Sequence, residues 1–304
     1  MKKYLAFLLV AVLLLTAGCT RSLQGLDRKE TQEEETAPTK DETTQATEED
    51  PAPAPMPEPV QQDKVYIYQL TKNEYNGTVE EQCTYNSYGD QEQYVLNGSI
   101  TRRVFEYNAQ GQRTKATVYL NYNELDSTYE YIYEDGLWAE TVSRDAQGQV
   151  VTRANFYYDS QGRRTGMMEC GGDTFDLEQL VMERQWEYDA DGNVIRESEF
   201  SQGNYIVREY RYEDGRLTGW YELVNGTQTY DCRYVYENGR IVRDEWLDAD
   251  GNVGTTYYYT YNGDTCTLTG TDGRTVTFTR KQVTLEQARV LWLRYGATSC
   301  FIEQ

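Results

Sequence analysis

Carboxylates are the side chains with which this chain could do acid–base chemistry, because its 304 residues include 50 aspartates and glutamates and no histidine. The missing histidine removes the commonest general base and the serine and cysteine triads that need one. The net charge of −21 argues against nucleic acid and anionic lipid surfaces as partners, because like charges repel. An enzyme would have to use paired carboxylates, for which the sequence gives no distances. We therefore expect a non-enzymatic protein.

Two segments resemble fragments of calcium-binding loops. In the first, Asp189 and Asp191 precede Gly192-Asn193, and residues 248–252 repeat the pattern. Neither segment has the distal bidentate glutamate of a complete calcium loop. Turn formation alone explains these residue types, since Asp, Asn and Gly are the residues that tight turns favour. We expect no metal site and no cofactor.

Aromatic side chains are the candidate ligand surface. Together with the 28 tyrosines, four tryptophans could stack on sugar rings: Trp138, Trp186, Trp220 and Trp246. The same rings are favoured by cross-strand packing within a sheet. We therefore favour a core position for them and keep sugar binding as the alternative.

The cysteines argue against zinc and dithiol chemistry, since an odd number follows Cys19 and none has Cys-x-x-Cys spacing. These five residues are Cys83, Cys170, Cys232, Cys266 and Cys300. In a simple meander Cys232 and Cys266 lie on strands that are not neighbours, so we expect no bridge between them. The other pairings stay open.

An aromatic-x-Tyr pair recurs about every 24 residues and positions most of these rings. The two rings of a pair lie on one face of a strand, because side chains alternate between faces. A weaker first copy ends at Tyr85, and the others are Phe105/Tyr107, Tyr131/Tyr133, Phe156/Tyr158, Trp186/Tyr188, Tyr210/Tyr212, Tyr234/Tyr236 and Tyr259/Tyr261. This pattern predicts repeated β-hairpins.

Turns of two lengths follow the pairs. Asp135-Gly136 is typical of the short type I′ turn, and residues 189–192 are typical of a type I turn closed by a glycine bulge. A second glycine turn falls midway through most repeats, which predicts an antiparallel meander over residues 64–283. The exception is residues 163–185, where we expect a longer loop or lid. The predicted fold is all-β: an elongated, twisted meander, curved or partly rolled.

The segments FEYNAQGQR, FYYDSQGRR, WEYDADGNV and WLDADGNV resemble the YD repeats of bacterial RHS proteins, whose hairpins form a long winding sheet. The resemblance covers residues 85–275. Segments such as YVYENGRI also resemble MORN-type repeats. This chain shows neither the larger number of repeats that builds a closed shell nor the RHS core motif, so the toxin-delivery function does not carry over.

The residue pattern of segment 284–304 predicts one helix that caps the sheet. Thr284 and Gln287 fit a capping box, and Gly296 suits the helix stop. Apolar residues recur between them at helical spacing, and Trp292 is one of them. A terminal repeat needs a cap, so we expect this apolar stripe to cover the exposed end of the sheet, with Trp292 in the core.

The N-terminal residues have the features of a targeting signal. Lys2 and Lys3 precede an apolar run too short to span a bilayer, and the run ends in Leu15-Thr16-Ala17-Gly18-Cys19. This ending resembles the lipobox of bacterial lipoproteins, which implies a signal peptide over 1–18 and acylation of Cys19, including palmitate. Residues 19–63 are rich in Thr, Glu and Pro and predict a disordered acidic linker that spans roughly 35 Å as a flexible coil.

We therefore expect a lipoprotein anchored to the cell membrane on its extracytoplasmic face, or to an outer membrane if the cell has one. Its expected role is binding or structural, with cell-wall glycan or an envelope protein as partner. A carboxylate-dependent hydrolase of cell-wall glycan is the first alternative. A small relative of RHS toxin-shell proteins is the second.

Overall fold

The structure is a computed structural model that describes residues 64–248, 250–296 and 298–303. The chain divides into two units, Met1–Glu58 and Pro59–Gln304, and all described residues belong to the second. The expected signal peptide, Cys19 and the whole of the expected linker lie outside the described residues. Among the helices that the structure describes, none has the length and apolar character needed to cross a bilayer.

Nineteen strands and one α-helix make up the described unit. In the first half of the unit the strands are β1 (Lys64–Tyr75), β2 (Thr78–Tyr85), β3 (Gln91–Leu96), β4 (Ser99–Tyr107), β5 (Arg113–Leu120), β6 (Glu124–Glu134), β7 (Leu137–Asp145), β8 (Val150–Tyr158) and β9 (Arg164–Gly171). In the second half the strands are β10 (Leu180–Tyr188), β11 (Val194–Ser201), β12 (Asn204–Glu213), β13 (Arg216–Val224), β14 (Thr227–Glu237), β15 (Arg240–Leu247), β16 (Val253–Asn262), β17 (Thr265–Gly270), β18 (Arg274–Thr284) and β19 (Cys300–Glu303). The helix α1 (Leu285–Tyr295) lies between β18 and β19.

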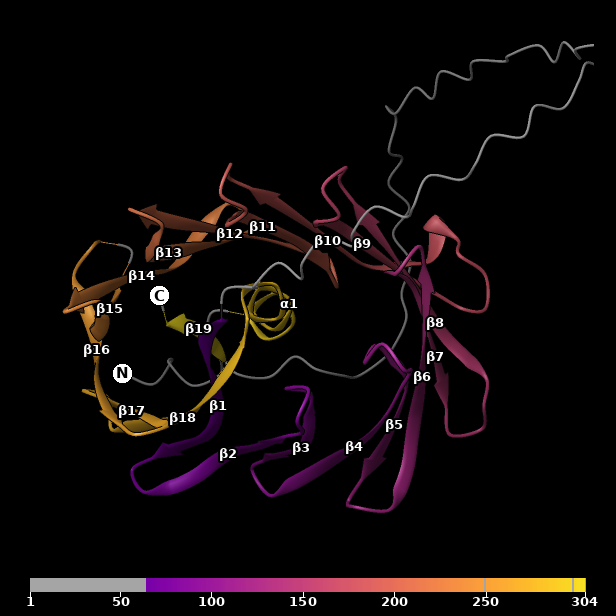
Figure 1. Cartoon of the computed structure of the whole chain (residues 1–304), viewed down its shortest axis with the longest axis horizontal. Coiled ribbons are helices and arrows are strands. Elements are labelled where there is room, and N and C mark those ends of the chain that lie inside the picture. Colours follow the sequence, from indigo (N-terminus) through magenta and orange to yellow (C-terminus); the bar gives the residue numbers. More distant parts are fainter. Residues whose placement is uncertain (1–63, 249, 297, 304) are drawn as a thin grey trace, which may run out of the picture. The chain divides into compact units, whose positions relative to one another are not determined.

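The strands form one antiparallel meander, as predicted, because each strand from β1 to β17 pairs with the next along the chain. The sheet is more closed than the curved or partly rolled sheet that the sequence predicts. β1 also pairs with β18, from Lys64 opposite Thr284 to Tyr75 opposite Arg274, so the sheet closes into a barrel (Figure 1). Twisted sheets of this many strands curl, and closure removes both free edges.

The predicted hairpin turns are confirmed. Asp135 and Gly136 have φ of 48° and 80°, the positive values that a type I′ turn requires of both central residues. At the long turn, the Gly192 N–H donates to the Asp189 carbonyl at 3.2 Å and Gly192 has φ of 81°. Asp and Asn tolerate this left-handed region, and glycine adopts it without strain.

The prediction of a longer loop over residues 163–185 is wrong for most of that segment. Strands β9 and β10 occupy it and pair with each other. Only residues 172–179 connect them, including a short 3-10 turn at Leu177–Gln179 whose N-cap is Asp176. The wider repeat spacing therefore lengthens one hairpin connection and does not interrupt the meander.

β-Bulges explain why so many repeats end in tyrosine. At β7, Ile132 faces Glu140 while Tyr133 faces Trp138, so one extra residue interrupts the ladder after Trp138. The Tyr158 hydroxyl of the next strand donates to the Trp138 carbonyl at 2.9 Å. The same arrangement, an acceptor carbonyl just before a bulge, recurs for Tyr85 with Leu70, Tyr188 with Arg164, Tyr236 with Leu217 and Tyr261 with Ile241. Phenylalanine could not satisfy these carbonyls.

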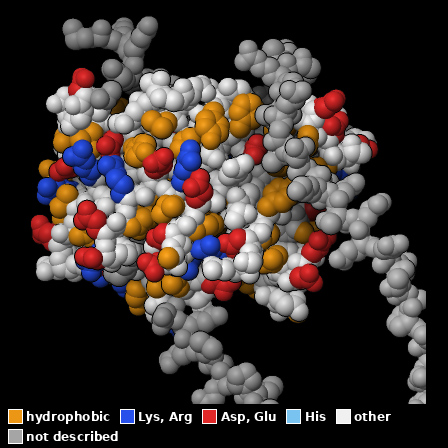
Figure 2. All heavy atoms as spheres, turned by 90° about the horizontal axis from the view of Figure 1, so that it is seen from above, with side chains coloured by type: hydrophobic (Ala, Val, Ile, Leu, Met, Phe, Trp, Pro, Cys, Tyr) orange, Lys and Arg blue, Asp and Glu red, His pale blue; other side chains and the backbone are white. Residues whose placement is uncertain are grey.

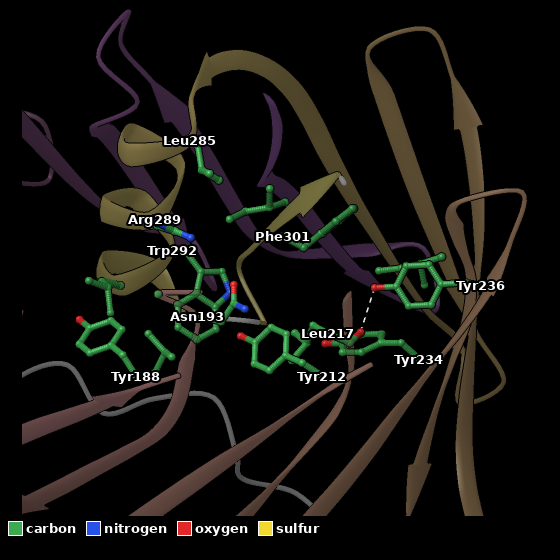
Figure 3. A pocket seen from close by; sticks show the side chains of 15 residues that line it. Tyr188, Asn193, Tyr212, Leu217, Tyr234, Tyr236, Leu285, Arg289, Trp292 and Phe301 are labelled. Carbon is green, nitrogen blue, oxygen red and sulfur yellow. Dashed lines mark hydrogen bonds between the residues drawn. The ribbon is translucent and has the colours of Figure 1, made fainter. Parts of the chain in front are cut away.

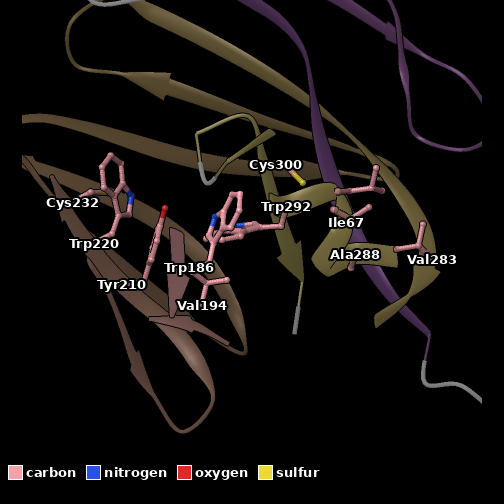
Figure 4. Close-up of a cluster of buried hydrophobic side chains, with 11 residues drawn as sticks. Ile67, Trp186, Val194, Tyr210, Trp220, Cys232, Val283, Ala288, Trp292 and Cys300 are labelled. Carbon is pink, nitrogen blue, oxygen red and sulfur yellow. The ribbon is translucent and has the colours of Figure 1, made fainter. Parts of the chain in front are cut away.

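The predicted helix is confirmed, including the capping box of Thr284 with Gln287 and the stop at Gly296. Its expected place is wrong, since no exposed sheet end remains for it to cover. Figure 1 shows α1 and β19 inside the ring of strands. The apolar stripe of α1 packs on the inner faces of β10 to β14, and Trp292 is 8% exposed within this core, as expected (Figure 4).

Strand β19 has no counterpart in the sequence prediction. It pairs with β1, from Tyr66 opposite Glu303 to Gln69 opposite Cys300. Phe301 stacks on Tyr68 with ring centroids 4.6 Å apart, in a second core that includes residues of β15, β17 and β18. The C-terminal segment thus fills one side of the barrel interior.

The outer surface carries charges of both signs between hydrophobic side chains, as Figure 2 shows for one face. On β7 and β8, Glu140 forms an ion pair with Arg153, and Val142, which lies opposite Arg153 in the ladder, is only 2% exposed. Long charged side chains therefore cover apolar residues of the outer face with their alkyl stems. Exposed ion pairs of this kind add little to stability individually.

Candidate functional site

The barrel interior has two different sides. Where α1 packs against the wall, the inward-facing rings of Trp186, Tyr210 and Trp220 are 5%, 6% and 4% exposed. On the side formed by β4 to β9, the corresponding ring pairs remain partly exposed, as at Phe105 and Tyr131. Contact with the helix therefore accompanies the full burial of Trp186, Tyr210 and Trp220.

A tyrosine pocket lies between α1, β19 and the wall strands β10 to β15 (Figure 3). It encloses about 90 Å³, and its aromatic lining comprises Tyr188, Tyr212, Tyr234, Tyr236, Trp292 and Phe301. Leu217, Leu285 and Ile302 add apolar surface. This volume admits a single small ring or side chain and is below that of pockets that enclose whole drug-sized ligands.

Most tyrosine hydroxyls of the pocket are already engaged. Tyr236 donates to the Leu217 carbonyl at 2.9 Å, the dashed line of Figure 3, and Tyr188 donates to the Arg164 carbonyl at 2.5 Å. Tyr234 accepts from the Trp220 indole at 3.3 Å. Tyr212 differs, because its hydroxyl has no hydrogen-bond partner among the described residues. Tyr212 can therefore both donate to and accept from a ligand.

The polar residues of the pocket come from the β10–β11 turn and from α1. The Asn193 side-chain amide donates to the Asp189 carboxylate at 2.9 Å, which leaves its carbonyl oxygen as an acceptor. Arg289 of α1 donates to the Asp191 carbonyl at 2.8 Å. The turn is thus fixed to the helix, and an amide and a guanidinium stand beside the aromatic surface.

Three carboxylates of the barrel interior, Glu197, Glu222 and Asp244, are already engaged. Glu197 and Glu222, both 8% exposed, flank Arg208 at 3.5 and 2.9 Å. Asp244 is 4% exposed and accepts from Tyr259 at 2.8 Å and from Trp246 at 3.0 Å. Burial raises the pKa of Asp244 to about 6, although these hydrogen bonds oppose the shift.

The structure does not gather the four candidate tryptophans into one ligand surface. Trp186 and Trp220 are core residues, and Trp246 packs on Trp220 with centroids 5.5 Å apart. Trp138 lies elsewhere, against Tyr131, with its indole N–H donating to the Thr141 hydroxyl at 2.9 Å. Cross-strand packing therefore governs the positions of all four.

The turn aspartates serve the turns. The Asp189 carboxylate accepts from the Asn193 N–H at 2.8 Å, and Asp248 accepts from the Asn252 N–H at 2.9 Å. Hydrogen bonds, chiefly that from the Asn252 backbone, hold the pKa of Asp248 below its ordinary value. Within the described ranges, no group of three or more His, Cys, Asp or Glu side chains is placed to hold a metal ion. The five cysteines after Cys19 are buried free thiols.

The pocket residues divide by how visible they are in the sequence. Tyr188, Tyr212 and Tyr236 belong to the aromatic pairs, and Trp292 belongs to the predicted helical stripe. Arg289 and Phe301 were missed, because one lies on the polar side of that helix and the other in a segment with no recognisable pattern. The convergence of these residues depends on the placement of α1 and β19 inside the barrel.

No protein-family model and no curated protein matches the chain. Among solved structures, a chain of the TcdB2-TccC3-Cdc42 crystal structure is 16% identical with a TM-score of 0.31; the match covers 62% of this chain and 13% of that one. A porin-like protein from Bacteroides uniformis is 13% identical with a TM-score of 0.39, over 73% of this chain and 96% of that one. This chain thus spans only a small part of the toxin-complex chain.

Proposed function

We propose that this chain is an extracytoplasmic lipoprotein, anchored through Cys19, that binds a ligand of the cell envelope in its tyrosine pocket. The observation that carries the proposal is the hydroxyl of Tyr212, which has no partner among the described residues and lies in an otherwise hydrogen-bonded aromatic pocket. Aromatic faces with a few fixed polar groups are typical of sites for sugar rings and for single protein side chains. Cell-wall glycan and an envelope protein are both suitable ligands on these grounds.

The test is binding of soluble fragments of purified cell wall to the full-length protein, followed by tryptophan fluorescence, with Trp292 as the reporter in the pocket. Replacing Tyr212 with Phe keeps the ring and removes only the hydroxyl. We expect affinity to fall about fivefold to thirtyfold, the effect of one hydrogen bond worth about 1–2 kcal/mol, with an unchanged melting temperature.

Tyr236→Phe is the matched control. It removes a hydroxyl that serves the Leu217 carbonyl, so we expect a lower melting temperature and little change in affinity. Saturable binding that Tyr212→Phe leaves intact would reject the pocket as the binding site. Failure of cell-wall fragments and of crosslinked envelope proteins to bind at all would reject the proposed function.

A carboxylate-dependent wall hydrolase is the second candidate, and Asp244 is the observation in its favour. A carboxyl whose pKa is raised to about 6 suits a general acid. Against this, its two oxygens already accept from Tyr259 and Trp246, and it is 4% exposed. Release of reducing ends from purified wall, lost in Asp244→Asn, would establish the hydrolase and overturn the binding role.

A further inference from the structure

The side of the barrel interior that β4 to β9 form, where the rings are partly exposed, carries arginines stacked on aromatic rings. We call it the open side. The Arg113 guanidinium carbon lies 4.6 Å from the Tyr131 ring centroid and 5.4 Å from that of Trp138. The Arg164 guanidinium carbon lies 4.9 Å from the centroids of both Trp138 and Phe156. Two guanidinium groups thus lie near the same indole, in positions fixed by cation–π contacts.

A third arginine reaches this region from α1. Arg294 forms an ion pair with Asp90, a carboxylate that is 2% exposed, and the Arg113 Nε lies 3.7 Å from the other Asp90 oxygen. Tyr107 also donates to Asp90 at 2.7 Å. Asp90 is therefore fully engaged, and it is the ion-pair partner of both Arg113 and Arg294. We call Arg113, Arg164 and Arg294 the arginine patch.

Arg164 is the member without a compensating charge. It forms no ion pair with any residue that the structure describes, and its buried Nε has no hydrogen-bond partner there. Burial, together with the positive charge of Arg294, lowers the pKa of Arg164. A largely buried guanidinium without a counter-charge is unfavourable, and the cation–π contacts with the neighbouring rings offset only part of that cost.

Solvent reaches the patch, because the side chains of Arg113 and Arg294 are 11% and 23% exposed. The full chain has a net charge of −21, which repels anions in general. Because the rest of the chain repels anions, the arginine patch favours only an anion whose shape fits between its guanidinium groups. Planar guanidinium groups held by packing match the oxygen pairs of carboxylate and phosphate groups.

We propose that the arginine patch binds a small ligand through a carboxylate or phosphate group, with Arg164 as the residue that the anion neutralises. None of the three arginines lines the tyrosine pocket, so this site goes beyond the proposed function and does not depend on it. The proposal makes the open side of the barrel interior a second binding surface.

Thermal unfolding of the full-length protein tests the proposal at constant ionic strength, set with sodium chloride. Inorganic phosphate supplies one anion, glucuronate supplies a carboxylate on a sugar, and glucose is the neutral comparison. We expect a saturable rise in melting temperature with phosphate or glucuronate and no rise with glucose. Whichever anion gives the lower dissociation constant identifies the preferred group.

Arg164→Gln should raise the dissociation constant at least tenfold. It should also keep or raise the melting temperature without anion, because it removes an uncompensated buried charge. A purely structural arginine would instead lose stability and leave the anion response unchanged. Arg153→Gln is the matched control, since Arg153 pairs with Glu140 on the outer face of the adjacent strand β8. It should leave anion binding unchanged.

Three results would overturn the proposal: no saturable response of the wild type to either anion, an unchanged response in Arg164→Gln, or an equal loss in Arg153→Gln. If Arg164→Gln does not fold, Arg113→Gln replaces it, with the expectation of a raised dissociation constant alone, because Arg113 has Asp90 as its counter-charge. Titration of wild-type tryptophan fluorescence needs no variant, because Trp138 lies beside both guanidinium groups. A flat titration with both anions would also reject the site.

Discussion

A single oxygen atom distinguishes the tyrosines that end most repeats from phenylalanine. The hydroxyl crosses to the preceding hairpin and satisfies a backbone carbonyl beside a bulge, as Tyr158 does for Trp138. The ring contributes apolar contact, and the hydroxyl donates to a carbonyl of the barrel wall that the strand ladder leaves unpaired. The many tyrosines in this chain are therefore in large part a consequence of bulges that recur in the wall.

Tyr158→Phe should lower the free energy of unfolding by about 1–2 kcal/mol, because it leaves a partly buried carbonyl unsatisfied. Tyr157→Phe is the control, since the neighbouring ring is 42% exposed and its hydroxyl contacts only the Met168 sulfur at 3.8 Å. That change should stay within about 0.5 kcal/mol. Equal effects of the two substitutions in urea unfolding would show that the hydroxyl contributes no more than an exposed one.

At the scale of the element, turns make the sharpest demand on residue type. Gly192 has φ of 81°, and a Cβ placed there would lie 3.2 Å from the Arg289 guanidinium. Gly192→Val should cost about 1–3 kcal/mol through backbone strain, whereas Asp191→Asn should cost little. Gly254→Ala is the control, because Gly254 lies on β16 without a positive φ and with its nearest contact at 3.7 Å.

Melting temperatures of these variants with and without EDTA also separate turn formation from calcium binding. Asp189 already accepts hydrogen bonds from Asn193, and we expect no chelator effect on the wild type. A rise in melting temperature with calcium that EDTA reverses and Asp191→Asn abolishes would favour a calcium loop instead.

The sequence predicted local features well and distant ones poorly. Asp-Gly pairs and the Thr284 capping box act within a few residues, so their turns and helix start were visible in the chain. The pairing of Lys64 with Thr284 joins opposite ends of the repeat region and has no local signal. For the same reason the sequence indicated the tyrosines of the pocket but not their meeting with Phe301 or Arg289.

At the scale of the whole molecule, the proposed anchor determines where the barrel works. Cys19→Ala should release the protein from membranes into the medium or periplasm, because the apolar run before it is too short to hold the chain as a span. Detergent-phase partitioning with immunoblotting measures this. Partitioning of the variant that equals the wild type would contradict the lipid anchor.

The closure of the barrel has a consequence for the export that we propose. The first half of β1 is flanked by β18 and β19, the last strands to be made, so it stays without its final neighbours until the C-terminus emerges. Contacts between chain ends form slowly, because a long loop must close before they contribute. A chain that crosses a membrane from its N-terminus therefore presents an open sheet with two free edges throughout translocation, and it becomes a barrel only on completion.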